Sequence, residues 1–552
     1  MDDSIIGNVR GELFTSKMLY LYSYTNDKFE ELVQNINYYM DEKNHEKIDN
    51  LHHLKNFFNI YTKYLEIKNN DKEIAEALYV TCLWYIHQYI YPPKCQITTV
   101  DEKGKEYILY GSIADYLIKK YMIVSANGVS YIFIGNMYYV DNGRIEKDIN
   151  KMLKDVGYSE THKIEPIIKE IVRRIRGETM KFKSYPFNAK SRYLVPVKNG
   201  VVIRRKLNIL LPQSPVWGFT YSLPIIYDPK KSANNVLKFI SDIVERENRE
   251  LLLQIPAHAL LQNEGLQLSY LLTGGGANGK STYINLITAL IGPENITAVG
   301  LQELLEDRFK IAELQGKLMN MYADLVKTSL KTTGKFKILT GGDEITVERK
   351  YAHPFKMTNK AVLVFSANEL PDVDDGTYAF WRRWAVIPFP KTFDNDPTFQ
   401  KNLITSDNLS GLLNVVLIEM DKIEERNGLV RSNKVEEIMT MWKQRSNSAY
   451  AFVKETIVKD VGAFIPKDII WNEYLRWCEE VDLSPVTKIK FKSEFDKIGA
   501  EDMLIQQDKR RIRVFKGVRR HTDKPSDVCN MTNDVNNEQK TKNANILEQT
   551  DD

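Results

Sequence analysis

The fold of this chain is decided by the stretch Leu271-Leu272-Thr273-Gly274-Gly275-Gly276-Ala277-Asn278-Gly279-Lys280-Ser281-Thr282. It reads G-x-x-x-x-G-K-S, with an apolar run before it (268–272) and apolar residues at helical spacing after it (283–291). Strand, glycine-rich loop and helix in this order predict a phosphate-binding loop. Glycines let successive backbone N–H groups face a polyphosphate, and the start of the helix adds its own unpaired N–H groups. We therefore predict that residues 274–282, called the phosphate loop below, bind a nucleoside triphosphate.

Two side chains of the phosphate loop have predicted roles of their own. The ammonium group of Lys280 would bridge the β- and γ-phosphates, and the hydroxyl of Ser281 would hold Mg²⁺. The predicted cofactors are therefore ATP and Mg²⁺.

The composition predicts a globular protein with several domains. The chain has 552 residues, and single hydrophobic cores stop growing near about 250–300 residues. The formal charge is only +3, so the whole molecule is not a polycation. Residues 488–520, however, hold eleven Lys and Arg residues against five Asp and Glu residues, a local net charge of +6. This basic segment predicts either a nucleic-acid contact or an ordinary solvated surface.

The cysteines and the N-terminus indicate a cytoplasmic protein of the host cell without a membrane partner. Four cysteines lie far apart and form no C-x-x-C pair, which argues against a zinc ribbon and a disulfide framework. The first residues lack the basic start and apolar run of a signal peptide. The most apolar segment, 79–92, is too short to span a bilayer and predicts a buried helix.

Hydrophobic periodicity predicts an α/β protein divided into seven segments. Strand and helix candidates alternate in the motor segment, 266–395, as they do in a sheet flanked by helices. The tail is polar and predicted to be disordered. The predicted segments are a helical domain (1–95), a mixed α/β domain (96–210), a helical pre-motor or collar segment (211–265), the motor segment (266–395), a helical extension (396–447), a C-terminal module (448–518) and the tail (519–552). Within the third and fifth of these segments, the helical stretches are predicted over 233–263 and 412–442.

Four further residues in the motor segment are candidates for catalysis. Asp324 ends the β-prone run 317–324 and is the predicted metal carboxylate. Asn368 follows the strand candidate 361–365 and would orient the attacking water, unless it only forms a turn. Arg382 and Arg383 follow an aromatic pair, and an arginine there suits a charge-stabilising finger that reaches the γ-phosphate of a neighbouring subunit.

The block 339–355 predicts a turn followed by a β-hairpin. Arg349, Lys350 and His353 would lie near its tip, where cations can contact a nucleic-acid backbone. The alternative is a solvated turn without a function.

The C-terminal module predicts a helix from 465 to about 477, a second helix over 487–495 and a β-ribbon. The second helix carries Lys488, Lys490 and Lys492, and the alternating run 510–515 predicts an edge strand of the ribbon with Arg511 and Arg513. Helix, basic helix and ribbon are the order of a winged helix, whose basic helix would contact DNA. The alternative is a module that stabilises a ring or docks a protein partner.

The motor motifs, taken in order, resemble the superfamily 3 helicases, specifically the primase–helicase type of phages, plasmids and large DNA viruses. The resemblance is strong over 266–392. The motifs that carry it are GGGANGKST (274–282), LMNMYADL (318–325), LTGGDEITVERK (339–350), VLVFSAN (362–368) and FWRRWAVIPF (380–389).

This resemblance implies an AAA+-like core that forms a ring, usually hexameric, around DNA and moves 3′ to 5′ along one strand. It also implies that the hairpin lines the central channel and that ATP binds between subunits. One departure concerns the metal site: many members carry two adjacent acids where this chain has Ala323 and Asp324. Either Asp324 serves both metal and water, or another carboxylate supplies the base, with Asp343 and Glu344 as candidates.

The sequence therefore predicts an ATP-dependent DNA helicase of a mobile genetic element or virus. Its expected partners are single-stranded and forked DNA, further copies of itself in a homo-hexamer, and a separate primase or polymerase. One alternative is a bifunctional primase–helicase, for which residues 1–210 show no D-x-D strand followed by a histidine-containing block. Another is a DNA-binding ATP switch that marks an origin without unwinding it.

Overall fold

The computed structural model describes most of the chain between residues 51 and 522. The predictions for 1–50 and for 523–552, including most of the disordered tail, lie outside the described residues. The described ranges are 51–67, 72–85, 88–89, 95–126, 128–158, 164–180, 187–189, 191–204, 210–262, 265–325, 330, 333–350, 353–371, 373, 377–394, 396–430, 432–507 and 510–522.

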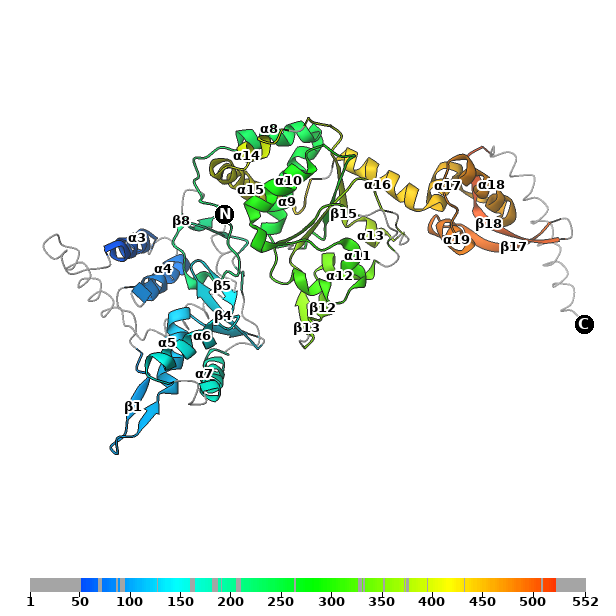
Figure 1. The fold of residues 1–552 in the computed structure, drawn as a ribbon. Helices are drawn as coiled ribbons and strands as arrows, with labels where there is room; N and C mark the ends of the chain where they lie inside the picture. The colour runs from blue at the N-terminus through cyan, green and yellow to red at the C-terminus, as the bar shows by residue number, and fades with distance from the viewer. Residues whose placement is uncertain are drawn as a thin grey trace, which may run out of the picture.

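A five-stranded parallel sheet forms the centre of the molecule (Figure 1). Every residue of its middle strand is buried, as expected for a parallel strand covered by helices on both faces. The sheet confirms the predicted α/β architecture. In spatial order its strands are β10 (Ile296–Thr297), β11 (Met319–Tyr322), β14 (Val362–Ala367), β9 (Ser269–Thr273) and β15 (Trp384–Pro388).

The strand order determines which loops meet. Because β9 pairs with β14, and β14 with β11, the carboxyl ends of these three strands lie side by side at one edge of the sheet. The phosphate loop follows β9, Asn368 follows β14 and Asp324 follows β11. The sheet thus gathers three predicted site segments that are far apart in sequence.

Helices surround the sheet, and each of the two stretches predicted to be helical, 233–263 and 412–442, is occupied by two α-helices. The break in the first stretch lies at Val244, whose backbone is extended (φ −129°, ψ 163°). The break in the second lies at Asn427, which is left-handed (φ 50°) and precedes Gly428. The helices are α8 (Asn234–Ile243), α9 (Arg249–Leu260), α10 (Lys280–Ile291), α11 (Leu301–Glu306), α12 (Gly334–Gly341), α13 (Tyr378–Trp381), α14 (Phe399–Leu403), α15 (Ser406–Arg426) and α16 (Asn433–Ser446), with 3₁₀ turns η5 (Pro215–Trp217), η6 (Arg246–Asn248), η7 (Pro293–Asn295) and η8 (Lys310–Leu314).

A β-hairpin leaves the motor between α12 and β14, which confirms the predicted hairpin. Its arms are β12 (Glu344–Val347) and β13 (Phe355–Thr358), and the last cross-strand pair joins Val347 to Phe355. The described residues 348–350 and 353–354 therefore belong to the connection between the two arms. The outgoing arm starts at Gly342, whose left-handed φ of 81° ends α12.

The N-terminal part contains helices and short antiparallel sheets. The helices over 110–179 share a small apolar core that includes Ile113, Leu117, Ile149 and Ile171, whereas buried residues of the two helices over 51–85 belong to the same core as the motor. Its elements are α3 (Leu51–Ile67), α4 (Lys72–Tyr85), β1 (Thr98–Val100), β2 (Glu106–Ile108), α5 (Tyr110–Tyr121), β3 (Val124–Ala126), β4 (Val129–Ile134), β5 (Met137–Val140), α6 (Arg144–Asp155) and α7 (Ile164–Thr179).

A second antiparallel sheet joins this part to the motor. Strands β6 (Leu194–Val197), β7 (Gly200–Ile203) and β8 (Leu210–Leu211) fall in the predicted 96–210 segment, yet their buried residues belong to the same apolar core as the motor. Arg204, just after β7, is fully buried and pairs with two acids of α15, Asp421 (Nε to Oδ1, 2.9 Å) and Glu424. The charge of Arg204 is thus compensated across the junction.

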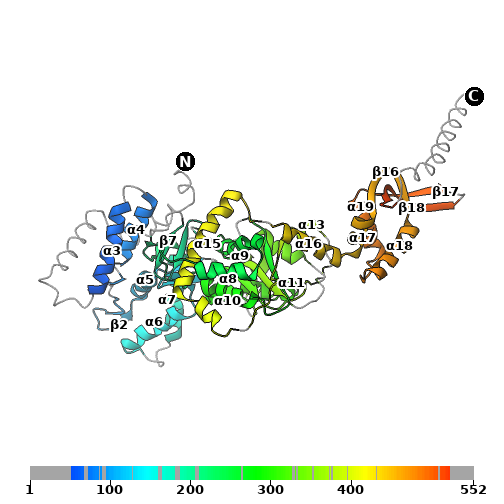
Figure 2. The same cartoon turned by 90° about the horizontal axis from the view of Figure 1, so that it is seen from above.

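The C-terminal module has a separate core and lies at the far end of α16 from the motor (Figures 1 and 2). Strand β18 lies between β16 and β17, so the predicted position of this strand at the ribbon edge is wrong. The error arose because 457–466, which contains Lys459, Asp460 and Gly462, was not recognised as a strand. The elements are α17 (Ser448–Thr456), β16 (Ile457–Pro466), α18 (Lys467–Glu480), α19 (Lys488–Lys497), β17 (Glu501–Gln507) and β18 (Arg510–Arg520).

The described helices include none that is both long and apolar enough to cross a membrane.

Candidate active site

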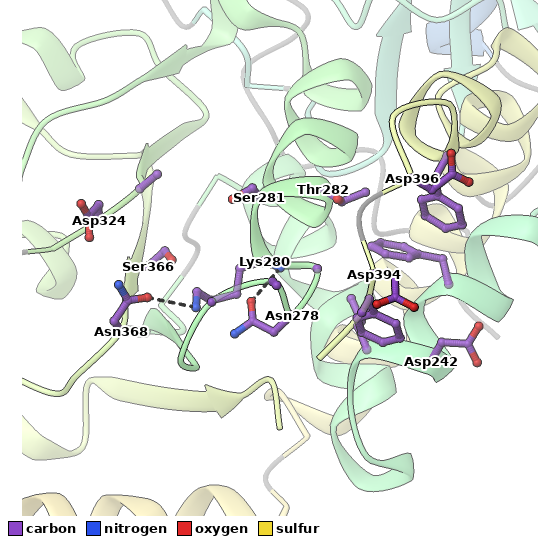
Figure 3. Close-up of a pocket in the computed structure, with 18 residues that line it drawn as sticks. Asp242, Asn278, Lys280, Ser281, Thr282, Asp324, Ser366, Asn368, Asp394 and Asp396 are labelled. Atoms are coloured by element: carbon purple, nitrogen blue, oxygen red, sulfur yellow. Dashed lines mark hydrogen bonds between the residues drawn. The ribbon is translucent and has the colours of Figure 1, made fainter. Parts of the chain in front are cut away.

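A cavity of about 660 Å³ opens at the carboxyl edge of the central sheet (Figure 3). Seven residues of the phosphate loop line it, together with side chains that follow β11, β14 and β15 and side chains of α8 and α14. The lining residues are Phe239, Asp242, Ile243, Gly276, Ala277, Asn278, Gly279, Lys280, Ser281, Thr282, Ala323, Asp324, Ser366, Asn368, Phe393, Asp394, Asp396 and Phe399.

Close packing explains why two positions of the phosphate loop are occupied by glycine. A Cβ on Gly274 would lie 2.6 Å from the carbonyl oxygen of Phe389, a backbone atom that cannot move aside cheaply. A Cβ on Gly279 would lie 2.6 Å from Cγ2 of Ile243, and this glycine also has a left-handed φ of 86°. Gly275 has open space around it, so the structure gives no packing reason for that glycine.

Lys280 holds its ammonium group inside the loop. The residue is 6% exposed, and its Nζ donates to the carbonyl oxygen of Gly274 and to Oδ1 of Asn368 at 3.5 Å. Burial lowers the pKa of Lys280, while the nearby Asp324 carboxylate acts in the opposite direction. An anion bound beside this ammonium group would stabilise its charged form.

Asn278 is the other buried polar side chain of the loop. It is 4% exposed, and its Oδ1 accepts from the backbone N–H of Lys280 at 3.4 Å. Its Nδ2 is buried and has no hydrogen-bond partner among the described residues. The loop therefore carries an unused donor, which fits an acceptor-rich ligand such as a polyphosphate.

The predicted metal ligands, Ser281 and Asp324, line the same cavity. Asp324 is exposed and has a left-handed backbone (φ 75°) two residues after β11. Mg²⁺ is usually held by one or two protein oxygens together with substrate phosphates, so a hydroxyl and a carboxylate suit it. Within the described ranges, no group of three or more His, Cys, Asp or Glu side chains is arranged to hold a metal ion.

Neither candidate for the second catalytic acid lines the cavity. Asp343 lies at the base of the hairpin, and Glu344 pairs with Lys356 at 2.6 Å within the hairpin. The hairpin departs from α12 and carries both acids away from the phosphate loop.

Sequence reasoning missed the end of the cavity opposite Asp324. Figure 3 shows aromatic rings and three acids there, across the phosphate loop from Asn368. The rings of Phe239 and Phe399 lie 5.7 Å apart, and Phe393 also lines this end. These residues come from α8, the segment after β15 and α14, and no spacing in the sequence connects them. Flat apolar walls of this kind suit a nucleobase.

The paired arginines lie at the other end of β9. The backbone N–H and hydroxyl of Ser269, the first residue of β9, both donate to the carbonyl oxygen of Arg383, at 2.8 and 2.7 Å. The phosphate loop starts after the last residue of β9, about 13 Å away at about 3.3 Å per residue. Neither Arg382 nor Arg383 lines the cavity of its own subunit.

The predicted hairpin cations differ in their contacts. Lys350 and His353 are exposed in the loop that connects β12 to β13. Arg349 instead donates to Oε1 of Gln315 at 2.7 Å, and its guanidinium lies 5.2 Å from the ring centroid of Phe355. Lys350 and His353 are therefore better placed than Arg349 to meet a ligand.

The basic residues of the C-terminal module also fall into two groups. On α19, Lys488 lies over the Trp471 ring at 5.4 Å, and Lys492 pairs with Asp496 at 3.2 Å, while Lys490 is exposed. On β18, Arg511 and Arg513 are both exposed. Part of the predicted basic face of α19 is thus engaged within the module.

Comparisons with known proteins connect these regions to viral replication proteins. Residues 272–383 match a family of unknown function (DUF5906), and residues 444–531 match the Poxvirus D5 protein-like family. A "Putative helicase L207/L206" of Acanthamoeba polyphaga mimivirus is 33% identical over 175 residues, which are 30% of this chain and 17% of that protein. A "Putative primase C962R" of African swine fever virus is 21% identical over 363 residues, which are 59% of this chain and 37% of that protein. The chain is thus similar to viral proteins named as a helicase and as a primase, which supports its resemblance to the viral primase–helicases of superfamily 3.

The relationship to these primase–helicases confirms the resemblance seen in the sequence motifs. The matches span 17% to 37% of the length of the viral relatives, well under two thirds. A solved structure of the C-terminal region of NrS-1 (apo, A form) covers 72% of this chain and 95% of its own, with 14% identity and a TM-score of 0.42. A score this low supports no argument about this chain.

Proposed function

We propose that this protein is an ATP-driven DNA helicase that separates DNA strands during replication of a virus or mobile element, in the cytoplasm of its host cell. The observation that carries the proposal is the cavity that combines the phosphate loop, Asp324 and Asn368, on a subunit that also presents an exposed basic hairpin loop. A nucleotide site alone suits many enzymes, and the hairpin gives this one a means of contacting DNA.

The roles of the cavity residues follow from their chemistry. The loop amides and Lys280 would bind the β- and γ-phosphates of ATP, and Ser281 and Asp324 would hold Mg²⁺, which supplies charge neutralisation on the phosphates when bound. The amide of Asn368, within 3.5 Å of the Lys280 ammonium, would orient the attacking water beside the γ-phosphate. Among the described residues that line the cavity, Asp324 is the acid at the phosphate end, and it would accept the proton of that water (Figure 3).

An AAA+-like ring, of six subunits by family resemblance, would complete the site. Arg382 or Arg383 lies at the opposite end of β9 from the phosphate loop, which supports delivery of an arginine to the γ-phosphate of the next subunit. A head-to-tail arrangement of this kind closes into a ring.

DNA would pass through the centre of the ring, with Lys350 and His353 on its backbone and with movement in the 3′ to 5′ direction. Such contacts bind phosphates and ignore base sequence. In the C-terminal module, the element order α17, β16, α18, α19, β17, β18 supports a winged helix, and we propose that Lys490, Arg511 and Arg513 add a second DNA contact.

The proposal is tested by ATP hydrolysis and strand separation on forked DNA with a single 3′ or 5′ tail. We expect continuous hydrolysis that single-stranded DNA accelerates, and unwinding only with a 3′ tail. Slow hydrolysis that stops after one turnover, without unwinding, would instead identify an ATP switch. Unwinding only with a 5′ tail would reverse the proposed polarity.

A second candidate function is primer synthesis, which is favoured by the match to the African swine fever virus protein named as a primase. The test is incorporation of labelled nucleotides on a single-stranded template by this chain alone. Incorporation that survives loss of Lys280 would place a polymerising site outside the cavity.

A further inference from the structure

The side chain of Gln267 connects the paired arginines to the base of the hairpin. Its Oε1 accepts from Nη2 of Arg382 at 2.6 Å, and its Nε2 donates to the carbonyl oxygen of Gly341 at 3.4 Å. Gln267 stands two residues before β9 with a left-handed φ of 50°, a conformation that costs free energy for a residue other than glycine. One amide group therefore holds both segments at once.

Gly341 adjoins the position where the hairpin leaves α12. A Cβ on Gly341 would lie 3.0 Å from Oδ2 of Asp343 and 3.5 Å from Nη2 of Arg383. Arg383 itself is 7% exposed, and its Nη1 donates to the carbonyl oxygen of Ala379. The second arginine therefore lies close to Gly341, the residue whose carbonyl oxygen Gln267 contacts.

The two arms of the hairpin are held differently. Asn359, after β13, is 2% exposed and its Nδ2 donates to the carbonyl oxygens of Leu339 and Ala361, at 3.0 and 2.9 Å. The other arm leaves through Gly341 and Gly342, the second of which has a left-handed φ of 81°. The returning arm is anchored to α12 and to the residue before β14. The outgoing arm turns on Gly341 and Gly342, and Gln267 contacts the carbonyl oxygen of the first of these.

We propose that Gln267 is a positioning residue that couples the nucleotide interface to the DNA hairpin, an inference that rests on the proposed function. When Arg382 turns to the γ-phosphate bound by a neighbouring subunit, it gives up Oε1 of Gln267. Gln267 is then free to release the Gly341 carbonyl, and the outgoing arm of the hairpin can turn about Gly342. By reciprocity, DNA that shifts the hairpin changes how readily Arg382 leaves Gln267.

The experiment replaces Gln267 with Met, which keeps the length of the side chain and removes the amide. Gln262→Met is the matched control, because Gln262 is also left-handed (φ 53°) and its Nε2 donates to Ser191 Oγ at 2.9 Å, away from the hairpin. The ratio of DNA-stimulated to basal ATP hydrolysis is measured for each, with single-strand affinity and melting temperature. We expect Gln267→Met to keep basal hydrolysis and DNA affinity and to lose about 5-fold or more of the stimulation. Gln262→Met should keep the wild-type ratio.

Gly341→Ala is the second variant and decides the question if Gln267→Met does not fold. Its methyl group would separate Asp343 from Arg383 at the hairpin base, and alanine is compatible with the last position of α12. We expect the same loss of stimulation with basal hydrolysis retained. If the folded variants keep the wild-type ratio of DNA-stimulated to basal hydrolysis, the coupling is refuted and the proposed function is unaffected. A wild-type protein that hydrolyses ATP without any response to DNA would overturn the proposed function and the coupling with it.

Discussion

Replacing Arg382 with Ala tests whether each ATP site is shared between two subunits. Arg382 and the phosphate loop lie at opposite ends of β9, separated along the strand by about 13 Å. If Arg382 acts on ATP, it therefore acts on the ATP of a neighbour. The side chain is partly exposed and bonded to Gln267, so it can leave its present position without opening the core.

The Arg382→Ala substitution is expected to lower the rate of ATP hydrolysis strongly and to change the stability of the fold little. An arginine finger contributes about 10³- to 10⁵-fold to kcat, which corresponds to about 4–7 kcal/mol of transition-state stabilisation. ATP binding should change little, because the finger acts mainly on charge that develops in the transition state. Arg383→Ala should behave differently, because Arg383 is buried against the hairpin base and its loss leaves a gap there. We expect it to lower the melting temperature by several degrees.

The assay mixes Arg382→Ala subunits with Lys280→Ala subunits, each inactive alone. In an equal random mixture, roughly one quarter of the interfaces join an intact loop to an intact arginine. Hydrolysis should therefore recover to about a quarter of the wild-type rate if sites turn over independently. Subunit exchange is verified with differently tagged chains. Demonstrated exchange with no recovered hydrolysis would refute the shared site and assign Arg382 to its own subunit or to a structural role.

Three other outcomes are expected. Lys280→Ala alone should abolish ATP hydrolysis, since the loop keeps its amides but loses the ammonium group that would contact the β- and γ-phosphates. Normal turnover in this variant would show that the cavity is not the site of hydrolysis. Changing Lys350 and His353 to Ala should spare basal hydrolysis and reduce unwinding. It should also lower the slope of log affinity for single-stranded DNA against log salt concentration by about one unit per lost cation. Unwinding at the wild-type rate would instead indicate that the hairpin loop is only a solvated turn. Arg204→Ala should destabilise the fold by about 3–5 kcal/mol, because two acids of α15 lose a fully buried partner. Thermal denaturation measures this loss. The control is Lys231→Ala, which removes an exposed ion pair with Asp407 and should cause no comparable loss of stability.

Short-range patterns predicted much of the architecture. The apolar run before the phosphate loop became β9, and the block 339–355 contains the predicted hairpin. Both predictions rest on residue types within a few neighbouring positions. The breaks at Val244 and Asn427 inside the two helical stretches were not located, because apolar spacing does not report backbone conformation.

The candidate site was predicted in part for the same reason. Lys280, Ser281, Asp324 and Asn368 stand in recognisable local contexts, each directly after a buried strand or within a glycine-rich loop, and they line one cavity. Their catalytic roles remain predictions. The aromatic end of the cavity, with Phe239 and Phe399, was not foreseen because α8 and α14 are separated by the whole motor segment.

The sequence by itself determined the motif of the phosphate loop, the α/β class and the resemblance to viral primase–helicases, since these depend on residue types at fixed local spacing. Only the tertiary structure decided that Arg382 and Arg383 lie at the opposite end of β9 from the loop, that Asp343 and Glu344 lie outside the cavity, and that Gln267 joins the arginines to the hairpin. These relations depend on strand order and on the direction in which each segment leaves the sheet. Strand order is set by packing among residues distant in the chain, and no local pattern encodes it.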